Sequence, residues 1–392
     1  MNDVSTGLQE WKEDLHHLAR ELPARHKNLF FQIKPTEFEK SIVQLDTSLS
    51  SLSDHEIIVH LASIVASVGD SHTRLSVDQA SPIFRTYPLK LYSFQDGLCV
   101  VETTAEHSSL LGATLEQIGE RPIQNVVHTV KSMIPHENES QLRMALPDHV
   151  VTPGILHTFR ILSDMNEGLF TFTNADPFQV TFSPIPRHRS TSWIGFSARA
   201  KASVPLYLKH PNKHYWFDYL EKDQIVYFQY NSCQNMQEQT FADFSDELFG
   251  FIESNLVERL VFDMRNNGGG NSSIAEPFLS RIEKSPDLNR KGHLFVIIGR
   301  RTFSSAILNA MRLRKETAAI LAGEATGGKP NHYGEVLNFK LPNSQLEVYY
   351  STKHRVTSEQ DLRSIFPDIS IELSSSDYFS GRDPVLERIA TI

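Results

Sequence analysis

Short apolar runs alternate with helical stripes from residue 225 onward, and this alternation restricts the fold more than any other feature. The apolar runs are each suited to a buried strand and lie at 225–228, 260–263, 294–298 and 319–321. Phe241, Phe244 and Leu248 recur at helical spacing between the first two runs, and a second helix is expected to open at 304–308. This order predicts an α/β sheet whose strand ends feed the loops where sites gather.

The chain before this region has a different character. Leu8, Trp11 and Leu15 begin an amphipathic stripe, and a further helix is expected after Ser53-Asp54, a good N-cap pair. From about residue 85 the pattern changes to short strands. We therefore predict three parts, which are an N-terminal helical domain, a small β-rich module and an α/β catalytic core, at 1–75, 85–150 and 215–392.

Composition excludes several classes of function. The formal net charge of −9 implies no basic face, so neither nucleic acid nor an anionic membrane is expected as a partner. Two cysteines exclude a disulfide framework, and no histidine spacing typical of a metal site occurs, so neither metal nor cofactor is expected. No apolar stretch is long enough to span a membrane and no signal peptide is visible, which favours a cytoplasmic location unless the chain was trimmed.

A glycine-rich loop directly follows the apolar run at 260–263. Residues 263–271 read Asp-Met-Arg-Asn-Asn-Gly-Gly-Gly-Asn. Successive glycines let backbone N–H groups turn toward an anion, or toward an oxygen that becomes one during a reaction. A plain tight turn is the alternative, and the loop alone does not say which anion it would bind.

A serine pair stands where the run at 294–298 passes into a helix. The segment 302–306 reads Thr-Phe-Ser-Ser-Ala. Ser304 is placed as an ordinary helix N-cap, but a hydroxyl there also lies beside free N–H groups, which suits a nucleophile that builds an oxyanion. Because both loops follow strands of one sheet, both could face one cleft, and this pairing favours the catalytic interpretation.

The segment 323–329 imitates a phosphate-binding P-loop, with Gly323, Gly328 and Lys329 at the required spacing. The next residue is Pro330, where that motif needs a serine or threonine for magnesium. No amphipathic helix follows it. We therefore reject nucleotide binding.

The order of these motifs resembles the tail-specific, or C-terminal-processing, serine proteases. The matching segments are 263–270, 302–306, 323–328 and Pro-Asp at 367–368, and the resemblance covers roughly residues 215–372. It implies a crotonase/ClpP-like α/β protease core. Residues 85–135 resemble the PDZ-type module of that family more weakly, through Gly112, Leu115, Ile118 and Gly119. No carboxylate-binding Gly-Leu-Gly-Phe loop precedes Leu98, so the module is described as degenerate.

The family offers two bases for the serine, and this chain contains both. One branch uses a lysine at the position of Lys329, whereas the tricorn-like branch uses a histidine preceded by a serine, which matches Ser71-His72. In that branch an acidic residue also precedes the Pro-Asp motif, and Asp361 takes this position. A histidine needs little tuning because its intrinsic pKa of about 6.5 already suits a general base. We therefore favour His72.

The resemblance implies a serine peptidase that cleaves peptides or the C-terminal regions of unfolded polypeptides. Ser304 would be the nucleophile and His72 the base, with Ser71 and Asp361 orienting the histidine. The oxyanion donors would be the amides of Gly269 or Gly270 and of Ser305. Two alternatives stay open at this point, a non-hydrolytic ligand- or peptide-binding protein on the same scaffold and a crotonase-like acyl-CoA enzyme. The sequence indicates no oligomeric state.

Overall fold

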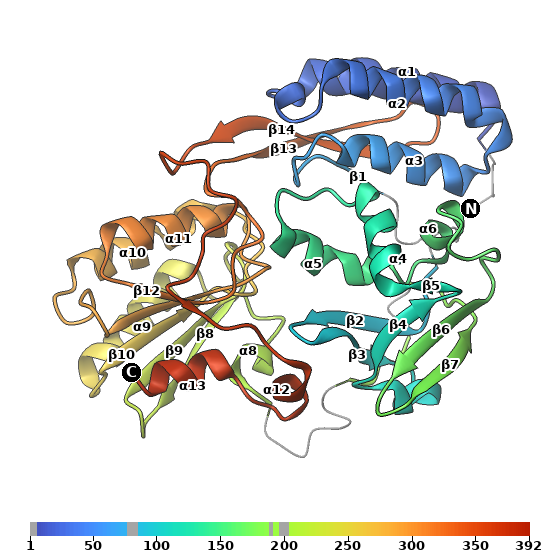
Figure 1. Cartoon of the computed structure of the whole chain (residues 1–392). Coiled ribbons are helices and arrows are strands. Elements are labelled where there is room, and N and C mark those ends of the chain that lie inside the picture. The colour runs from blue at the N-terminus through green and yellow to red at the C-terminus, as the bar shows by residue number, and fades with distance from the viewer. Residues whose placement is uncertain (1–5, 77–84, 188–190, 196–203) are drawn as a thin grey trace. The chain divides into compact units, whose positions relative to one another are not determined.

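The computed structural model describes residues 6–76, 85–187, 191–195 and 204–392 (Figure 1). Its contacts divide the chain into two compact units. The first unit comprises residues 1–137, 145–199 and 333–355, and the second comprises 138–144, 200–332 and 356–392. Among the described residues, no helix is both long and apolar enough to cross a membrane.

The first unit begins with three helices, α1 (Leu8–Arg25), α2 (Pro35–Ser48) and α3 (Asp54–Ala66). The apolar stripe of α1 is buried, as its spacing predicts. After α3 the chain enters β1 (Arg74–Ser76), which pairs antiparallel with β14 (Glu347–Arg355). Strand β13 (His332–Lys340) completes a three-stranded sheet in the order β1-β14-β13.

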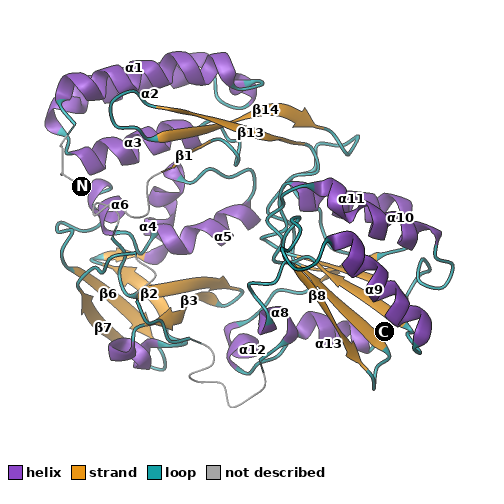
Figure 2. Cartoon of the chain, turned by 180° about the vertical axis from the view of Figure 1, so that it is seen from behind, coloured by secondary structure: helices purple, strands orange, loops and turns teal. Residues whose placement is uncertain are grey.

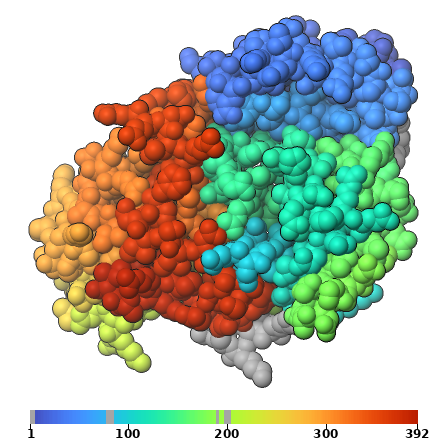
Figure 3. Space-filling view, viewed as in Figure 1, coloured from blue at the N-terminus to red at the C-terminus, as the bar shows by residue number. Residues whose placement is uncertain are grey.

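An antiparallel sheet forms the rest of the first unit. Its strands run in the order β2-β3-β4-β6-β7, with β5 paired to β4. Their bounds are β2 (Leu89–Phe94), β3 (Gly97–Thr103), β4 (Thr114–Ile118), β5 (Arg121–Pro122), β6 (Gly168–Thr173) and β7 (Pro177–Phe182). The helices α4 (Ile123–Val130) and α6 (Pro153–Thr158) accompany it, and α5 (Glu139–His149) begins in the second unit and ends in the first. In the space-filling view the blue N-terminal helices and the teal and green segments of this unit form one continuous surface (Figure 3).

The second unit is built on a six-stranded sheet in the order β15-β12-β11-β10-β9-β8. The bounds are β8 (Tyr215–Leu220), β9 (Ile225–Tyr230), β10 (Arg259–Asp263), β11 (Leu294–Ile298), β12 (Ile320–Gly323) and β15 (Ile369–Ser370). All neighbouring strands pair in parallel except β8, which is antiparallel to β9. The predicted α/β sheet is therefore confirmed, and the loops after β10, β11 and β12 leave from the same edge.

Helices cover both faces of this sheet (Figure 2). One face packs against α9 (Phe241–Ser254), α10 (Glu276–Lys284) and α11 (Ser305–Glu316), and the other against α13 (Pro384–Ala390). Because successive strand residues point to opposite faces, Phe262 joins the first core and its neighbour Val261 joins the second. Burial on both faces explains why these strands read as continuous apolar runs. The remaining helices are α8 (Leu206–Lys209) and α12 (Ser375–Phe379). Short 3₁₀ turns lie at Leu29–Phe31, Leu49–Ser51, Ala105–Leu110, Lys131–Met133 and Ser272–Ala275.

The two units divide the chain differently from the three predicted parts. The helical segment 1–75 and the module 85–150 fall in the same unit. The module's sheet also continues beyond residue 150, because β6 pairs with β4. Residues 333–355, expected in the core at 215–392, belong to the first unit because β14 pairs with β1.

Candidate active site

Ser304 occupies a strained turn between β11 and α11 in the second unit. Its backbone has φ 54° and ψ −123°, a conformation that costs a residue with a Cβ about 1–3 kcal/mol and that gathers at functional sites. Although Ser304 is the N-cap residue of α11, its side chain makes no capping hydrogen bond. The plain N-cap interpretation therefore does not account for this serine, and its partly exposed hydroxyl is left available for chemistry.

Thr302 holds this turn against the end of the neighbouring strand. Its buried hydroxyl accepts a hydrogen bond from the amide of Gly299 at 3.0 Å and donates one to the carbonyl of Met264 at 2.9 Å. The amide of Phe303 also donates to the carbonyl of Asn267 at 3.0 Å. The loops after β10 and β11 are thus tied together, which keeps the Ser304 turn in place.

The glycine loop lies directly against Ser304. A Cβ on Gly269 would stand 2.8 Å from the Cβ of Ser304, and Gly269 has φ +104°, so only glycine fits there. The amide of Gly269 already donates to Asn267 Oδ1 at 2.9 Å. By contrast, the amide of Gly270 donates to no residue in the described part of the chain. Of the two predicted glycine donors, the structure therefore favours Gly270.

Ser305 fastens the glycine loop to the start of α11. Its hydroxyl donates to the carbonyl of Gly270 at 2.5 Å, so this side chain already has a structural role. Its amide belongs to the first helical turn, where N–H groups have no partner within the helix. Two backbone N–H groups without a hydrogen-bond partner in the described part of the chain, those of Gly270 and Ser305, therefore belong to the two loops that meet at Ser304.

The carboxylates of the sequence motifs mainly hold loops in place. Asp263 is fully buried and forms an ion pair with Arg265, whose Nε lies 2.8 Å from its carboxylate, and Arg265 also pairs with Asp383. Glu324 pairs with Arg300 at 2.6 Å, and Asp368 accepts from the amide of Leu321 at 2.8 Å. These contacts explain why the motifs carry acidic residues, and they give these residues structural roles rather than catalytic ones.

Lys329 and Asp361, both predicted site residues, form an ion pair with each other. The Lys329 Nζ lies 2.9 Å from an Asp361 carboxylate oxygen. The lysine side chain is 13% exposed and that of Asp361 is 73% exposed. The structure thus brings Asp361 to Lys329, and the lysine ammonium is engaged in this ion pair.

His72 lies in the first unit, in the buried loop between α3 and β1. The neighbouring Asp70 is fully buried and accepts a hydrogen bond from the His72 amide at 3.0 Å. The same carboxylate oxygen lies 3.8 Å from His72 Nδ1. The other oxygen accepts from His26 at 3.0 Å and from the Thr73 hydroxyl at 2.6 Å. Asp70 therefore fixes the loop that carries the imidazole.

Asp70 is a residue that the sequence reasoning missed, although an aspartate two positions before a candidate base is a readable signal. Burial alone raises the pKa of Asp70, but the hydrogen bond from His26 and the nearby His72 outweigh it and hold the pKa well below its ordinary value. Ser71, which was predicted to orient His72, has a buried hydroxyl with no hydrogen-bond partner in the described part of the chain. Asp70 therefore places a carboxylate beside the imidazole, and Glu137 brings a second one within 4.8 Å of it.

Two clusters in the first unit offer three possible metal ligands each, His55 with Glu56 and His157, and Asp70 with His72 and Glu137. Glu56 is already engaged by Arg160 and by Ser53. Asp70 likewise accepts three hydrogen bonds. The carboxylates of Glu56 and Asp70 are therefore committed to other partners, and we assign no metal to either cluster.

We expect Asp70→Asn to destabilise the protein at neutral pH by about 3 kcal/mol, because it removes a buried charge on which several donors converge. The folded pKa of Asp70 lies below the unfolded value of about 3.8, so the wild-type advantage is complete above that pH. It should shrink below it by about 1.4 kcal/mol per pH unit. Urea unfolding of both proteins from pH 7 to pH 3 measures this. Asp176→Asn, at an exposed position in the same unit, is the control, and an equal loss there would contradict the assignment.

Comparison with known proteins identifies the fold. No protein-family model matches the sequence, and no curated protein matches it. Mature CPAF in complex with lactacystin matches with 14% identity and a TM-score of 0.66, covering 98% of both chains. A crystal structure of mature CPAF matches with 13% identity and a TM-score of 0.64, covering 97% of this chain and 96% of that one. The photosystem II D1 C-terminal processing protease matches with 12% identity, coverage of 99% and 97%, and a TM-score of 0.43. The chain therefore has the fold of CPAF over nearly its whole length.

Proposed function

We propose that this protein is a serine peptidase in which Ser304 is the nucleophile. The observation that carries the proposal is the Ser304 turn itself. A serine in a strained backbone conformation, without a capping hydrogen bond, stands beside backbone donors from Gly270 and Ser305. A hydroxyl and an oxyanion site in this relation are what acyl transfer needs, and a binding protein needs neither.

His72 is the general base of the proposal. Lys329 is the alternative, but its ammonium is paired with Asp361 at 2.9 Å, and a lysine base must be uncharged. His72 instead has the fully buried Asp70 beside it, and a carboxylate next to an imidazole stabilises the imidazolium that forms when the base takes a proton. The electrostatics of each unit therefore favour the histidine.

The reaction follows from these roles. The Ser304 hydroxyl attacks the scissile carbonyl while His72 takes its proton, and the amides of Gly270 and Ser305 stabilise the negative oxygen of the tetrahedral intermediate. His72 then returns the proton to the leaving amine, and a water molecule hydrolyses the acyl-enzyme by the same steps. The substrates are peptides or unfolded polypeptides. Support also comes from the CPAF fold, since one CPAF structure contains lactacystin, which becomes a compound to test here.

A fluorophosphonate probe tests this proposal directly, because it forms a covalent bond only with an activated serine. We expect the probe to label the protein once and peptide mapping to place the label on Ser304. Lactacystin can be tested in the same way, as a competitor of the probe. Absence of labelling, together with absence of peptide hydrolysis, would instead support a non-hydrolytic binding protein on the same fold.

We expect Gly270→Ala to lower kcat about a hundredfold or more, which is the usual effect of losing one oxyanion donor. Gly270 has φ +133°, and an added Cβ would stand 2.5 Å from the carbonyl oxygen of Cys233, so the amide must move. Gly268→Ala is the matched control, because a Cβ there meets no atom within 4 Å. Peptide hydrolysis and thermal unfolding are measured for both variants. Equal kcat values in the two variants would show that the glycine loop is only a turn.

A further inference from the structure

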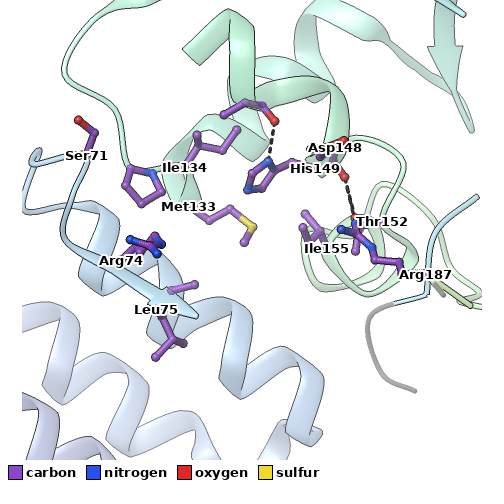
Figure 4. Close-up of a pocket in the computed structure, with 13 residues that line it drawn as sticks. Ser71, Arg74, Leu75, Met133, Ile134, Asp148, His149, Thr152, Ile155 and Arg187 are labelled. Carbon is purple, nitrogen blue, oxygen red and sulfur yellow. Dashed lines mark hydrogen bonds between the residues drawn. The ribbon is translucent and has the colours of Figure 1, made fainter. Parts of the chain in front are cut away.

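The first unit contains a cavity of about 320 Å³ that lies beside the loop of His72 (Figure 4). Its wall is mainly apolar and includes Met133, Ile134 and Ile155. Ser71, the residue before His72, also lines it. A mainly apolar cavity with a few polar groups is the usual form of a small-molecule site, and this volume lies near the lower end of the range for such sites.

A partly buried cation, Arg187, lies at one side of this cavity. Arg187 donates hydrogen bonds to the Asp148 carbonyl at 3.3 Å and to the Thr152 hydroxyl. Its Nε is buried with no hydrogen-bond partner in the described part of the chain, and the charge of the exposed Asp148 only partly offsets the cost of burial. Burial accordingly lowers the pKa of Arg187. A charge in apolar surroundings is costly unless it is paired, so this guanidinium is suited to receive an anion.

The other ionisable groups of the cavity give it a positive character. Arg74 lines the opposite side in Figure 4 and lies over the ring of Tyr349 at 4.2 Å. His149 lies between the two arginines, and burial lowers its pKa, so it is uncharged at neutral pH. Asp148 is the acidic residue among the lining groups, and it is exposed to solvent. The lining therefore holds two arginines and one aspartate on an otherwise mainly apolar wall.

We propose that this cavity binds a carboxylate on a compact apolar body, with the carboxylate paired to Arg187. The apolar body would lie against Met133 and Ile155, and the carboxylate would accept a hydrogen bond from the unpartnered Nε of Arg187. Two sources have this chemistry, a free apolar acid or the carboxylate-bearing leaving fragment of a peptide. The second source rests on the proposed function, because His72 would deliver a proton to the leaving amine and Ser71 joins that loop to the cavity.

The binding test uses 3-phenylpropionate and its uncharged amide as probes, measured calorimetrically on the full chain. We expect the acid to bind at least tenfold more tightly than the amide. Arg187→Gln should weaken binding of the acid at least tenfold and leave the amide unchanged, whereas Arg121→Gln, an arginine of the same unit outside the cavity, should change neither. Absence of acid binding, equal binding of acid and amide, or an unchanged affinity in Arg187→Gln would overturn the proposal.

A second variant keeps the test valid if Arg187→Gln fails to fold. Ala62→Phe adds a ring at a position that lines the cavity, so it should abolish binding of the acid, and unchanged binding would again overturn the proposal. All binding is repeated in Ser304→Ala, so that the result does not depend on hydrolysis. Failure of the proposed peptidase is therefore distinguishable from failure of this site.

Kinetics then distinguish the two sources of carboxylate. If the cavity receives the leaving fragment, 3-phenylpropionate competes with peptide substrates, and amidation of a peptide's free carboxylate raises its KM at least tenfold in the wild type but not in Arg187→Gln. If the natural ligand is a free acid, the acid binds with the same Arg187 dependence but does not compete with peptides. Both outcomes support the site and assign it to one source.

Discussion

Replacement of Ser304 by alanine is expected to lower peptide hydrolysis by about a thousandfold or more and to abolish labelling by a fluorophosphonate. The alanine removes the only atom that can bond to the scissile carbonyl, while the turn around it stays tied by Thr302 to the neighbouring strand. Hydrolysis and labelling are measured on the purified variant, together with thermal unfolding to show that the fold persists.

The neighbouring Ser305→Ala is the matched control for this experiment. It removes the hydrogen bond to the Gly270 carbonyl but leaves the Ser305 amide in place. We expect labelling to continue and the rate to fall by less than in Ser304→Ala. Lost activity in Ser305→Ala with retained activity in Ser304→Ala would shift the nucleophile by one residue.

The second large effect is expected for the general base. His72→Ala should be nearly as inactive as Ser304→Ala, with a loss of about a thousandfold or more in kcat, because a nucleophile and its general base act as a unit. Lys329→Ala should retain much of the rate, since the lysine is paired with Asp361 and performs no proton transfer in the proposal. Steady-state kinetics on one peptide substrate compare the two variants.

The same pair of variants can reverse the assignment. Full activity in His72→Ala, with a strong loss in Lys329→Ala, would assign proton transfer to the lysine and leave Asp361 as its partner. Asp361→Asn then serves as a further check. Under the histidine proposal its removal changes the rate little, because the exposed carboxylate contacts Lys329.

The secondary structure of the second unit could be predicted because its signals are local. The strands β9, β10 and β11 are buried on both faces and read as short apolar runs, and the stripe of α9 has helical spacing. Predictions that required distant pairing were less complete. The sheet of the module predicted at 85–150 continues into β6 and β7, and residues 333–355 belong to the first unit. Neither fact could be predicted locally, because each depends on which strand pairs with which.

The sequence by itself located the glycine loop and the serine at the start of a helix, because each is a short motif whose backbone requirement is written in neighbouring residues, whereas His72 was named through a family resemblance and stays a prediction. Only the tertiary structure decided that Lys329 pairs with Asp361 and that His26 contacts Asp70. It also decided that Arg187 lines an apolar cavity with Ser71. These facts join residues that are mostly far apart in the chain, and burial and strand pairing, rather than local propensity, bring such residues together.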